Sequence, residues 1–308
     1  MLVQRLIDDG LIAPPAPLVA MLSGGRDSVC MLDLAVRVRG GEAVRALHVN
    51  YGLRDAAGED ERCCAELCER LGVELEVERP RRPEGPGNLQ SWARDARYAA
   101  AAQLAEADGA TIVTGHTADD QVETILYRLA SSPSRRALLG MRARDGRLAR
   151  PLLGTTREET TEYCRRHGLP WCDDASNQEP AFARNRVRHG LIPELARIHP
   201  AAAENVLRTA ALLRDEAEVL DSLVEAELGR SAGRRRTISQ ERFAELHPAL
   251  RRLVLQRLAD AAAGRPVPGA ARFAEQVAGL RRTGRSMLDL GGGVRAVAER
   301  GVLRAERP

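Results

Sequence analysis

The stretch that decides the fold is the glycine-rich hexapeptide Ser23-Gly24-Gly25-Arg26-Asp27-Ser28. It follows an apolar run at 17–22 that is typical of a buried strand, and it precedes an apolar segment at 29–38 that is typical of a helix. Glycine lets the backbone come close to a ligand, and the first turn of a helix presents free N–H groups to negative charge. The sequence therefore predicts an anion-binding loop at 23–28.

Two familiar phosphate loops do not match this stretch. A Walker loop needs a Lys before its Ser or Thr, and the dinucleotide fingerprint needs a G-x-G-x-x-G pattern. Asp27 would repel a phosphate unless a divalent cation lay between them, which indicates a metal–nucleotide complex. A simple helix cap is the alternative interpretation of so short a turn.

The composition limits the class of protein. A chain of 308 residues suits two domains, or one domain with an appendage. No apolar run approaches ~18 residues, so we expect no transmembrane helix and no membrane partner. Asp8 and Asp9 interrupt the short apolar stretch at the N-terminus, which does not resemble a signal peptide. We therefore expect a cytoplasmic protein.

All 46 basic residues are arginine, and lysine is absent. This excludes a Schiff base, an enzyme-bound lysyl-adenylate and a Walker lysine. The six cysteines form no C-x-x-C pair, which disfavours a zinc ribbon or a cysteine-held iron–sulfur cluster. The arginines cluster at 135–150, 184–188 and 234–236, and such clusters favour a polyanionic partner.

Strand-like and helix-like segments alternate along the first half of the chain. The strands are expected at 17–22, 44–50, 73–77 and 110–114, and the helices at 29–38, 56–71, 89–107 and from about 118. This order predicts an α/β fold with a doubly wound, mostly parallel sheet of the Rossmann-like type. Ligands of such sheets bind beyond the carboxyl ends of the strands, where the hexapeptide, His48, Asn50, Gly115 and His116 fall.

The character of the sequence changes at about 199. Residues 201–228 have the pattern of one long amphipathic helix, followed by helices at 243–262 and 269–282. Short strands are expected at 286–290, 293–298 and 301–304. We therefore expect a large domain over 1–204, a linker helix over 205–230 and a small C-terminal α+β domain over 231–308.

A dense group of polar residues lies at 115–124. If a helix starts near Thr117, Asp119 and Asp120 lie within about one turn of Glu123, so that three carboxylates gather near one face. Like charges so placed are easier to understand if they hold a cation, either Mg²⁺ or the ammonium group of a substrate. The alternative is an acidic helix start that complements the helix dipole, which does not explain His116 or Glu123.

Two pairs of arginines have helical spacing. Arg94 and Arg97 share a helix face, which suits a clamp for a phosphate or a carboxylate. Arg184 and Arg188 also share a face and have no acidic residue between them, which favours contact with an anionic partner. For both pairs the alternative is a solvated helix face.

Together these segments resemble the tRNA(Ile)-lysidine synthase family of the PP-loop ATP-pyrophosphatase group, over roughly residues 17–195. The matching segments are 23–28, 48–54, 94–98, 115–124, 150–153, 174–177 and 184–188. The chain departs from the family at Tyr51, where a second His is usual, and at 129–134, where a glycine-rich turn is usual.

The resemblance implies an ATP-dependent ligation of L-lysine to C2 of the wobble cytidine in an isoleucine tRNA with a CAU anticodon. The C2 oxygen is first adenylated, with release of pyrophosphate, and the lysine amine then displaces AMP. ATP and Mg²⁺ are the implied cofactors. The domain over 1–204 would bind ATP and catalyse the reaction, and the domain over 231–308 would bind tRNA. A homodimer is the assembly that we expect.

The resemblance also implies roles for individual residues. Nucleotide contacts fall to Ser23, Gly24, Gly25, Arg26, Asp27, Ser28, His48, Asn50 and Gly115. Catalytic roles fall to Asp27, His116, Asp119, Asp120 and Glu123, with Asp27 and Asp120 as metal ligands. Substrate and tRNA contacts fall to Arg94, Arg97, Arg184, Asn185, Arg186 and Arg188. The division of labour among Asp119, Asp120 and Glu123 stays open.

Two other functions are compatible with parts of the pattern. A 2-thiocytidine-type thiolase has a similar loop but needs cysteines for an iron–sulfur cluster, and Cys63, Cys64 and Cys68 have the wrong spacing. A non-catalytic nucleotide-binding or RNA-binding module would have the loop but would release no pyrophosphate.

Overall fold

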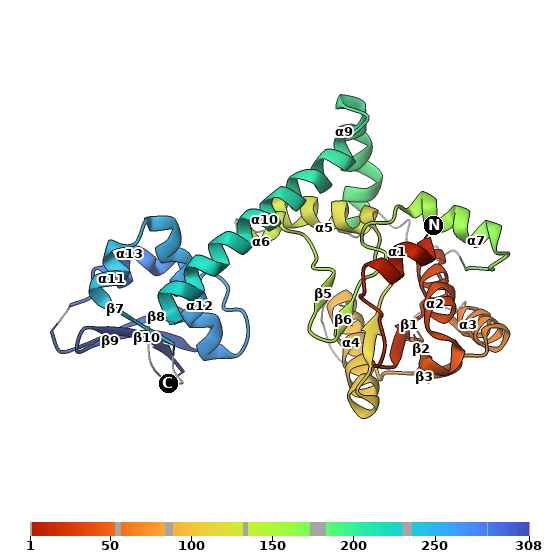
Figure 1. Ribbon diagram of the computed structural model, residues 1–308, viewed down its shortest axis with the longest axis horizontal. Helices are drawn as coiled ribbons and strands as arrows, with labels where there is room; N and C mark the ends of the chain where they lie inside the picture. Colours follow the sequence, from red (N-terminus) through yellow and green to blue (C-terminus); the bar gives the residue numbers. More distant parts are fainter. Residues whose placement is uncertain are drawn as a thin grey trace. The chain divides into compact units, whose positions relative to one another are not determined.

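The computed structural model describes residues 2–52, 57–83, 89–131, 135–172, 183–229, 236–281 and 283–307. The chain forms two compact units, Met1–Ala211 and Leu212–Pro308. Figure 1 shows the helices and strands of each. None of the described helices is long and apolar enough to cross a membrane.

The first unit contains a six-stranded sheet of order β3-β2-β1-β4-β6-β5, in which only β5 runs antiparallel to its neighbour. Its strands are β1 (Leu18–Met21), β2 (Val44–Val49), β3 (Glu74–Glu78), β4 (Thr111–Val113), β5 (Arg144–Asp145) and β6 (Leu148–Ala149). The predicted mostly parallel α/β sheet is confirmed.

Helices pack against both faces of this sheet. The helices that alternate with the strands are α2 (Arg26–Arg39), α3 (Ala57–Leu71), α4 (Leu89–Asp108) and α5 (Ala118–Ser131). In β1, Leu18 and Ala20 pack in the core that contains α2 and α3, whereas Val19 and Met21 pack against α4. Successive side chains of a strand point to opposite faces, so this alternation places β1 at the centre of a doubly wound sheet.

The order of the strands marks the binding edge. The chain runs from β1 outward through β2 to β3, and then returns to place β4 on the other side of β1. The loops after β1 and β4 therefore diverge to opposite faces, and the crevice between them is where ligands of such sheets bind. The hexapeptide follows β1, and Gly115 and His116 follow β4.

Further helices complete the first unit. They are α1 (Leu2–Asp8), α6 (Arg135–Leu138), α7 (Arg157–Arg166), α8 (Ala183–Arg186) and α9 (Ile192–Ile198). The long helix α10 (Ala202–Gly229) matches the helix expected at 201–228 and spans the boundary between the two units. The domain limits at 204 and 230 stay predictions. Residues 53, 54, 56, 132–134, 174–177, 234, 235 and 282 of the predicted segments lie outside the described residues.

The second unit contains a four-stranded antiparallel sheet of order β7-β10-β9-β8. Its strands are β7 (Thr237–Ser239), β8 (Arg285–Gly291), β9 (Val294–Glu299) and β10 (Val302–Glu306). The small C-terminal α+β appendage is thereby confirmed. Phe243, Leu255 and Leu258 are buried in its core.

The helices of the second unit differ from the sequence prediction. The single helix predicted at 243–262 is wrong, because α11 (Gln240–Glu245) ends before α12 (Pro248–Ala263) begins. Pro248 lacks an N–H and is suited to the first turn of a helix, so it starts a new one. The helix predicted at 269–282 is shorter, with a 3₁₀ turn at Ala270–Phe273 and α13 at Ala274–Ala278.

Candidate functional site

The hexapeptide forms a closed turn in front of α2. Gly24 has a φ of 83°, a conformation that favours glycine. The Ser28 hydroxyl donates to the carbonyl of Gly25 at 2.7 Å, and the backbone N–H of Ser23 donates to the Ser28 hydroxyl at 3.1 Å. Gly25 caps α2 without a side-chain bond, and the N–H of Ser28 donates to the carbonyl of Gly25 at 3.0 Å. The N–H groups of Arg26 and Asp27 are therefore the ones in this turn that are left for a ligand.

The end of β4 lies against this turn at Gly115. A Cβ atom at Gly115 would lie 2.6 Å from the carbonyl oxygen of Asp27, so only glycine fits. This close approach brings the backbone next to His116 to the first turn of α2. Gly115 therefore lets the end of β4 pack directly against the turn that follows β1, at the crevice.

His48 and Asn50 lie at the end of β2. The His48 imidazole is buried, and its Nδ1 donates to the carbonyl of Leu22 at 3.0 Å. The Asn50 amide donates to a Glu61 carboxylate oxygen at 2.8 Å and accepts from the N–H of Gly52 at 2.9 Å. Both side chains thus hold neighbouring segments of the protein, and their contact with a nucleotide stays a prediction.

Asp27 is held by residues of α7. The Thr160 hydroxyl donates to Asp27 Oδ1 at 2.5 Å, and Arg157 Nε lies 3.7 Å from Oδ2. Arg26 Nε donates to Oδ1 at 3.3 Å. Sequence reasoning missed Arg157 and Thr160.

A local signal for α7 was nevertheless present in the sequence. Thr156 and Glu159 form a capping box, in which the Thr156 hydroxyl accepts from the Glu159 N–H at 3.1 Å and Glu159 accepts from the Thr156 N–H at 2.8 Å. This signature predicts where the helix starts. It does not predict that the first turn of the helix faces Asp27.

Two arginines neutralise the carboxylates of α5. Arg157 Nη2 lies 3.2 Å from Asp120 Oδ1 and 3.4 Å from Glu123 Oε1. Arg188 Nε lies 2.5 Å from Glu123 Oε1, and its Nη2 lies 3.5 Å from Asp120 Oδ1. Burial alone would lower the pKa of Arg157, but the carboxylates around it raise that pKa. In this state the cations beside the acidic residues are guanidinium groups of the protein.

The contacts distinguish the three carboxylates. Asp119 accepts from the backbone N–H of Arg157 at 2.7 Å and so caps the start of α7. Asp120 accepts from the N–H of Thr117 at 2.9 Å, and its side chain is 18% exposed. The Glu123 side chain is only 3% exposed. In the part of the chain that the structure describes, no group of three or more acidic, His or Cys side chains is arranged to hold a metal ion.

The predicted arginines lie on several elements. Arg94 and Arg97 lie over the ring of Tyr98, 4.8 and 5.6 Å from its centroid. Arg184 Nη2 donates to the Thr124 hydroxyl at 2.9 Å, so α8 is joined to α5. Of the other predicted contacts, Asn185 and Arg186 also lie on α8, and Arg186 is exposed. Arg188 pairs with Glu123 and Asp120 as described, and its contact with tRNA stays a prediction.

His116 is uncharged at neutral pH. Burial lowers its pKa to about 4, since the attraction of Asp120 is opposed by Arg150, Arg97 and Arg184. Its Nδ1 lies 2.7 Å from the Thr114 hydroxyl. A neutral imidazole at the end of β4 can accept a proton from a reacting group.

We expect this histidine to make the protein less stable in mild acid. In the unfolded chain His116 binds a proton at about pH 6.5, whereas in the folded chain it does so only near pH 4. The free energy of unfolding is therefore unaffected by this group above pH 6.5 and falls as the pH drops toward 4, because protons then favour the unfolded chain. The loss should be on the order of 2–3 kcal/mol. Urea unfolding between pH 7.5 and 4.5 measures it. His116→Gln should flatten the dependence, with the exposed His199→Gln as control, and an unchanged profile in His116→Gln would contradict the assignment.

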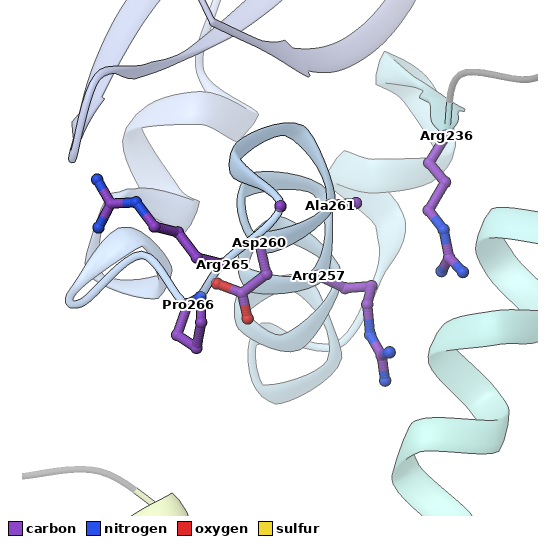
Figure 2. Close-up of a pocket in the computed structure, with 7 residues that line it drawn as sticks. Arg236, Arg257, Asp260, Ala261, Arg265 and Pro266 are labelled. Carbon is purple, nitrogen blue, oxygen red and sulfur yellow. The ribbon is translucent and has the colours of Figure 1, made fainter. Parts of the chain in front are cut away.

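A separate hollow of about 310 Å³ lies in the second unit (Figure 2). It is lined by Arg236, Arg257, Asp260, Ala261, Gly264, Arg265 and Pro266. Both Arg236 and Arg257 pair with Glu225, at 2.8 and 3.4 Å. Asp260 accepts from the N–H of Val267 at 2.8 Å. Because acidic partners offset much of its charge, this hollow is less strongly basic than its arginines alone suggest.

Comparison with known proteins places this geometry in context. The chain is 40% identical to the tRNA(Ile)-lysidine synthase of Pseudomonas fluorescens over 213 residues, which cover 67% of this chain and 48% of that protein. It is 38% identical to the tRNA(Ile)-lysidine synthase of Azoarcus sp. over 280 residues, which cover 88% of this chain and 61% of that protein. The chain therefore spans about half to three-fifths of the length of these relatives.

The fold also occurs among solved structures. The U34-tRNA thiolase NcsA of Methanococcus maripaludis, described with its 4Fe-4S cluster, superposes with a TM-score of 0.58 at 16% identity. The match covers 69% of this chain and 78% of that one, and at this identity it shows a shared fold alone. The sequence pattern of the PP-loop domain matches residues 3–195, which include every element of the crevice. The chain belongs to the PP-loop domain family.

Proposed function

We propose that this protein is an ATP-dependent carbon–nitrogen ligase that joins L-lysine to C2 of the wobble cytidine of an isoleucine tRNA with a CAU anticodon. The observation that carries the proposal is the bridge from the phosphate loop to the acidic helix. Arg157 contacts Asp27 of the loop and Asp120 and Glu123 of α5, so a nucleotide site and a cationic-substrate site adjoin. The tRNA(Ile)-lysidine synthases matched by the chain support the same reaction.

ATP would bind with its phosphates on the loop. The free N–H groups at the start of α2 suit the pyrophosphate, which leaves when the cytidine C2 oxygen attacks the α-phosphorus. Asp27 and Asp120 would hold Mg²⁺, since carboxylate oxygens are the ligands it prefers and both side chains face the cation Arg157. When bound, Mg²⁺ would offset negative charge on the triphosphate.

The second step needs a neutral amine. The lysine ammonium has a pKa of about 10.4, so it must lose a proton before its nitrogen attacks C2 and the bond from C2 to the AMP oxygen breaks. His116, which is uncharged at neutral pH, would take that proton. Asp119 and Glu123 would act by positioning α7 and the two arginines.

The tRNA would contact the arginines around the crevice. Arg94, Arg97, Arg184, Asn185, Arg186 and Arg188 keep their predicted roles in binding the RNA or the carboxylate of lysine. The second unit would add backbone contacts, as is common in RNA recognition. A homodimer and a cytoplasmic location complete the proposal.

Pyrophosphate release tests the proposal. The protein is incubated with ATP, Mg²⁺ and total tRNA, with and without labelled lysine. We expect tRNA-dependent pyrophosphate release and labelled tRNA. The absence of pyrophosphate release would point to a non-catalytic binding module, and release without labelled tRNA would indicate a ligase with another nucleophile.

A further inference from the structure

Among the residues that the structure describes, four arginines of the first unit have no acidic partner. Arg97, Arg150 and Arg184 lie close enough to His116 to lower its pKa, and Arg150 and Arg184 also lower the pKa of Arg128. In the described ranges, Arg97, Arg128, Arg150 and Arg184 take part in no ion pair, whereas the nearby Arg157 and Arg188 each bind two or more carboxylates. We call these four residues the arginine cluster. Unbalanced cations that are partly removed from water are unfavourable unless a ligand offsets them.

Hydrogen bonds hold the cluster together. Arg128 Nη1 donates to the carbonyl of Gly140 and Arg150 Nη1 to the carbonyl of Arg142, both at 2.7 Å, so the two side chains reach the same short segment. Arg184 donates to the Thr124 hydroxyl, and Thr124 lies one helical turn before Arg128 on α5. These bonds fix the guanidinium groups without neutralising them.

Several donors of the cluster are buried with nothing to bind. Arg150 is 7% exposed, and its Nε has no hydrogen-bond partner. The Nε of Arg97 and the hydroxyl of Tyr98 are buried and unpartnered as well. Buried donors are rarely left without an acceptor, so this arrangement points to a ligand that supplies acceptor oxygens.

The electrostatics agree with the geometry. Burial lowers the pKa of Arg128, and Arg184, Arg94 and Arg150 lower it further. Arg184, with Arg94, is exposed, so a ligand can reach the cluster from solvent.

We propose that Arg97, Arg128, Arg150 and Arg184 form a phosphate-binding site next to His116, at the carboxyl end of β4. A single carboxylate would balance one of four charges, whereas phosphate groups offer more charge and match the fork of arginine. The phosphate belongs either to the RNA backbone or to ATP. The inference rests on the proposed function only in the choice of RNA, since the positions of the arginines do not depend on the reaction. From the sequence, neither Arg128 nor Arg150 has a predicted role in the site, although Arg150 begins the matching segment at 150–153.

Binding experiments with the full-length protein test the site without any need for turnover. The variants are Arg128→Gln and Arg184→Gln, and the probes are ATP and a CAU anticodon stem-loop RNA, in the absence of lysine. Arg70→Gln is the matched control, because Arg70 also donates to a carbonyl, that of Gly168 at 3.1 Å, but lies on α3. We expect each variant to weaken at least one probe about tenfold.

The arms separate the two sources of phosphate. Weaker RNA binding, with a salt slope reduced by about 0.7–0.9 for each lost contact, assigns the site to the RNA backbone. Weaker ATP binding assigns it to the nucleotide. If neither probe binds more weakly than to Arg70→Gln, the site is refuted. Arg184 is exposed, so Arg184→Gln remains informative if Arg128→Gln fails to fold. If the variants bind a probe more weakly while the unchanged protein shows no ligase activity, the proposed function is refuted and the phosphate site stays intact.

Discussion

Asp27→Asn is expected to reduce tRNA-dependent pyrophosphate release by at least about 100-fold. The Asp27 carboxylate lies in the phosphate loop and accepts a hydrogen bond from Thr160 at 2.5 Å while facing Arg157 at 3.7 Å. Asparagine keeps the shape and can still accept from Thr160. The variant therefore removes the charge that would hold Mg²⁺ beside the triphosphate and leaves the fold of the loop in place.

Two further variants make this result specific. Thr160→Val keeps the charge of Asp27 but removes its hydrogen-bond donor, and we expect a smaller loss of about tenfold or less. Asp8→Asn, on the exposed end of α1, should leave pyrophosphate release unchanged. Pyrophosphate release by Asp27→Asn at the rate of Asp8→Asn would contradict the role given to Asp27.

Glu123→Gln is expected to lower the free energy of unfolding of the first unit by about 3–5 kcal/mol. Glu123 is buried, and its Oε1 and Oε2 lie 2.5 and 3.1 Å from nitrogens of Arg188. Its Oε1 also lies 3.4 Å from Arg157 Nη2. Removing its charge leaves two partly buried guanidinium groups with fewer carboxylates. The decrease in the free energy of unfolding is therefore larger than the net stabilisation that the ion pair itself provides. Urea unfolding measures this decrease.

A matched pair on the surface provides the control. Arg166 and Glu162 on α7 lie 3.1 Å apart with 70% and 61% of their side chains exposed, so Glu162→Gln should cost less than about 1 kcal/mol. The double variant Glu123→Gln with Arg188→Gln should lose less than the sum of the two single changes, because it removes both partners. Equal effects of Glu123→Gln and Glu162→Gln would show that the buried pair does not hold α5 to the helical turn Val187–Leu191, which carries Arg188.

The fold of the first unit could be predicted because its signals are local. Apolar runs of four to six residues, such as Leu18–Met21, identify buried strands, and the glycine turn after the first strand identifies the binding edge. Pro248 also marks the break between α11 and α12 in the sequence, but the apolar pattern continues on both sides of it and so predicts a single helix.

The partners of the charged residues could not be predicted in the same way. The segment at 184–188 contains no acidic residue, which suggested an external anion, yet Arg188 binds Glu123 from 65 residues away in the sequence. Thr160 reaches Asp27 across 133 residues. The balance of charges within a short segment of sequence therefore says little about which charges are neighbours in the fold. The arginines without an acidic partner can be told from Arg157 and Arg188 only by the ion pairs among the described residues of the structure.

Nucleoside analysis of the modified tRNA tests the central claim most directly. Isoleucine tRNA with a CAU anticodon is incubated with the protein, ATP, Mg²⁺ and lysine, then digested and analysed by mass spectrometry. The account predicts that the wobble cytidine is replaced by a nucleoside heavier by one lysine less one water, and that omission of ATP prevents this change. An unmodified wobble cytidine in the presence of pyrophosphate release, or lysine attached at any other nucleotide, would contradict it.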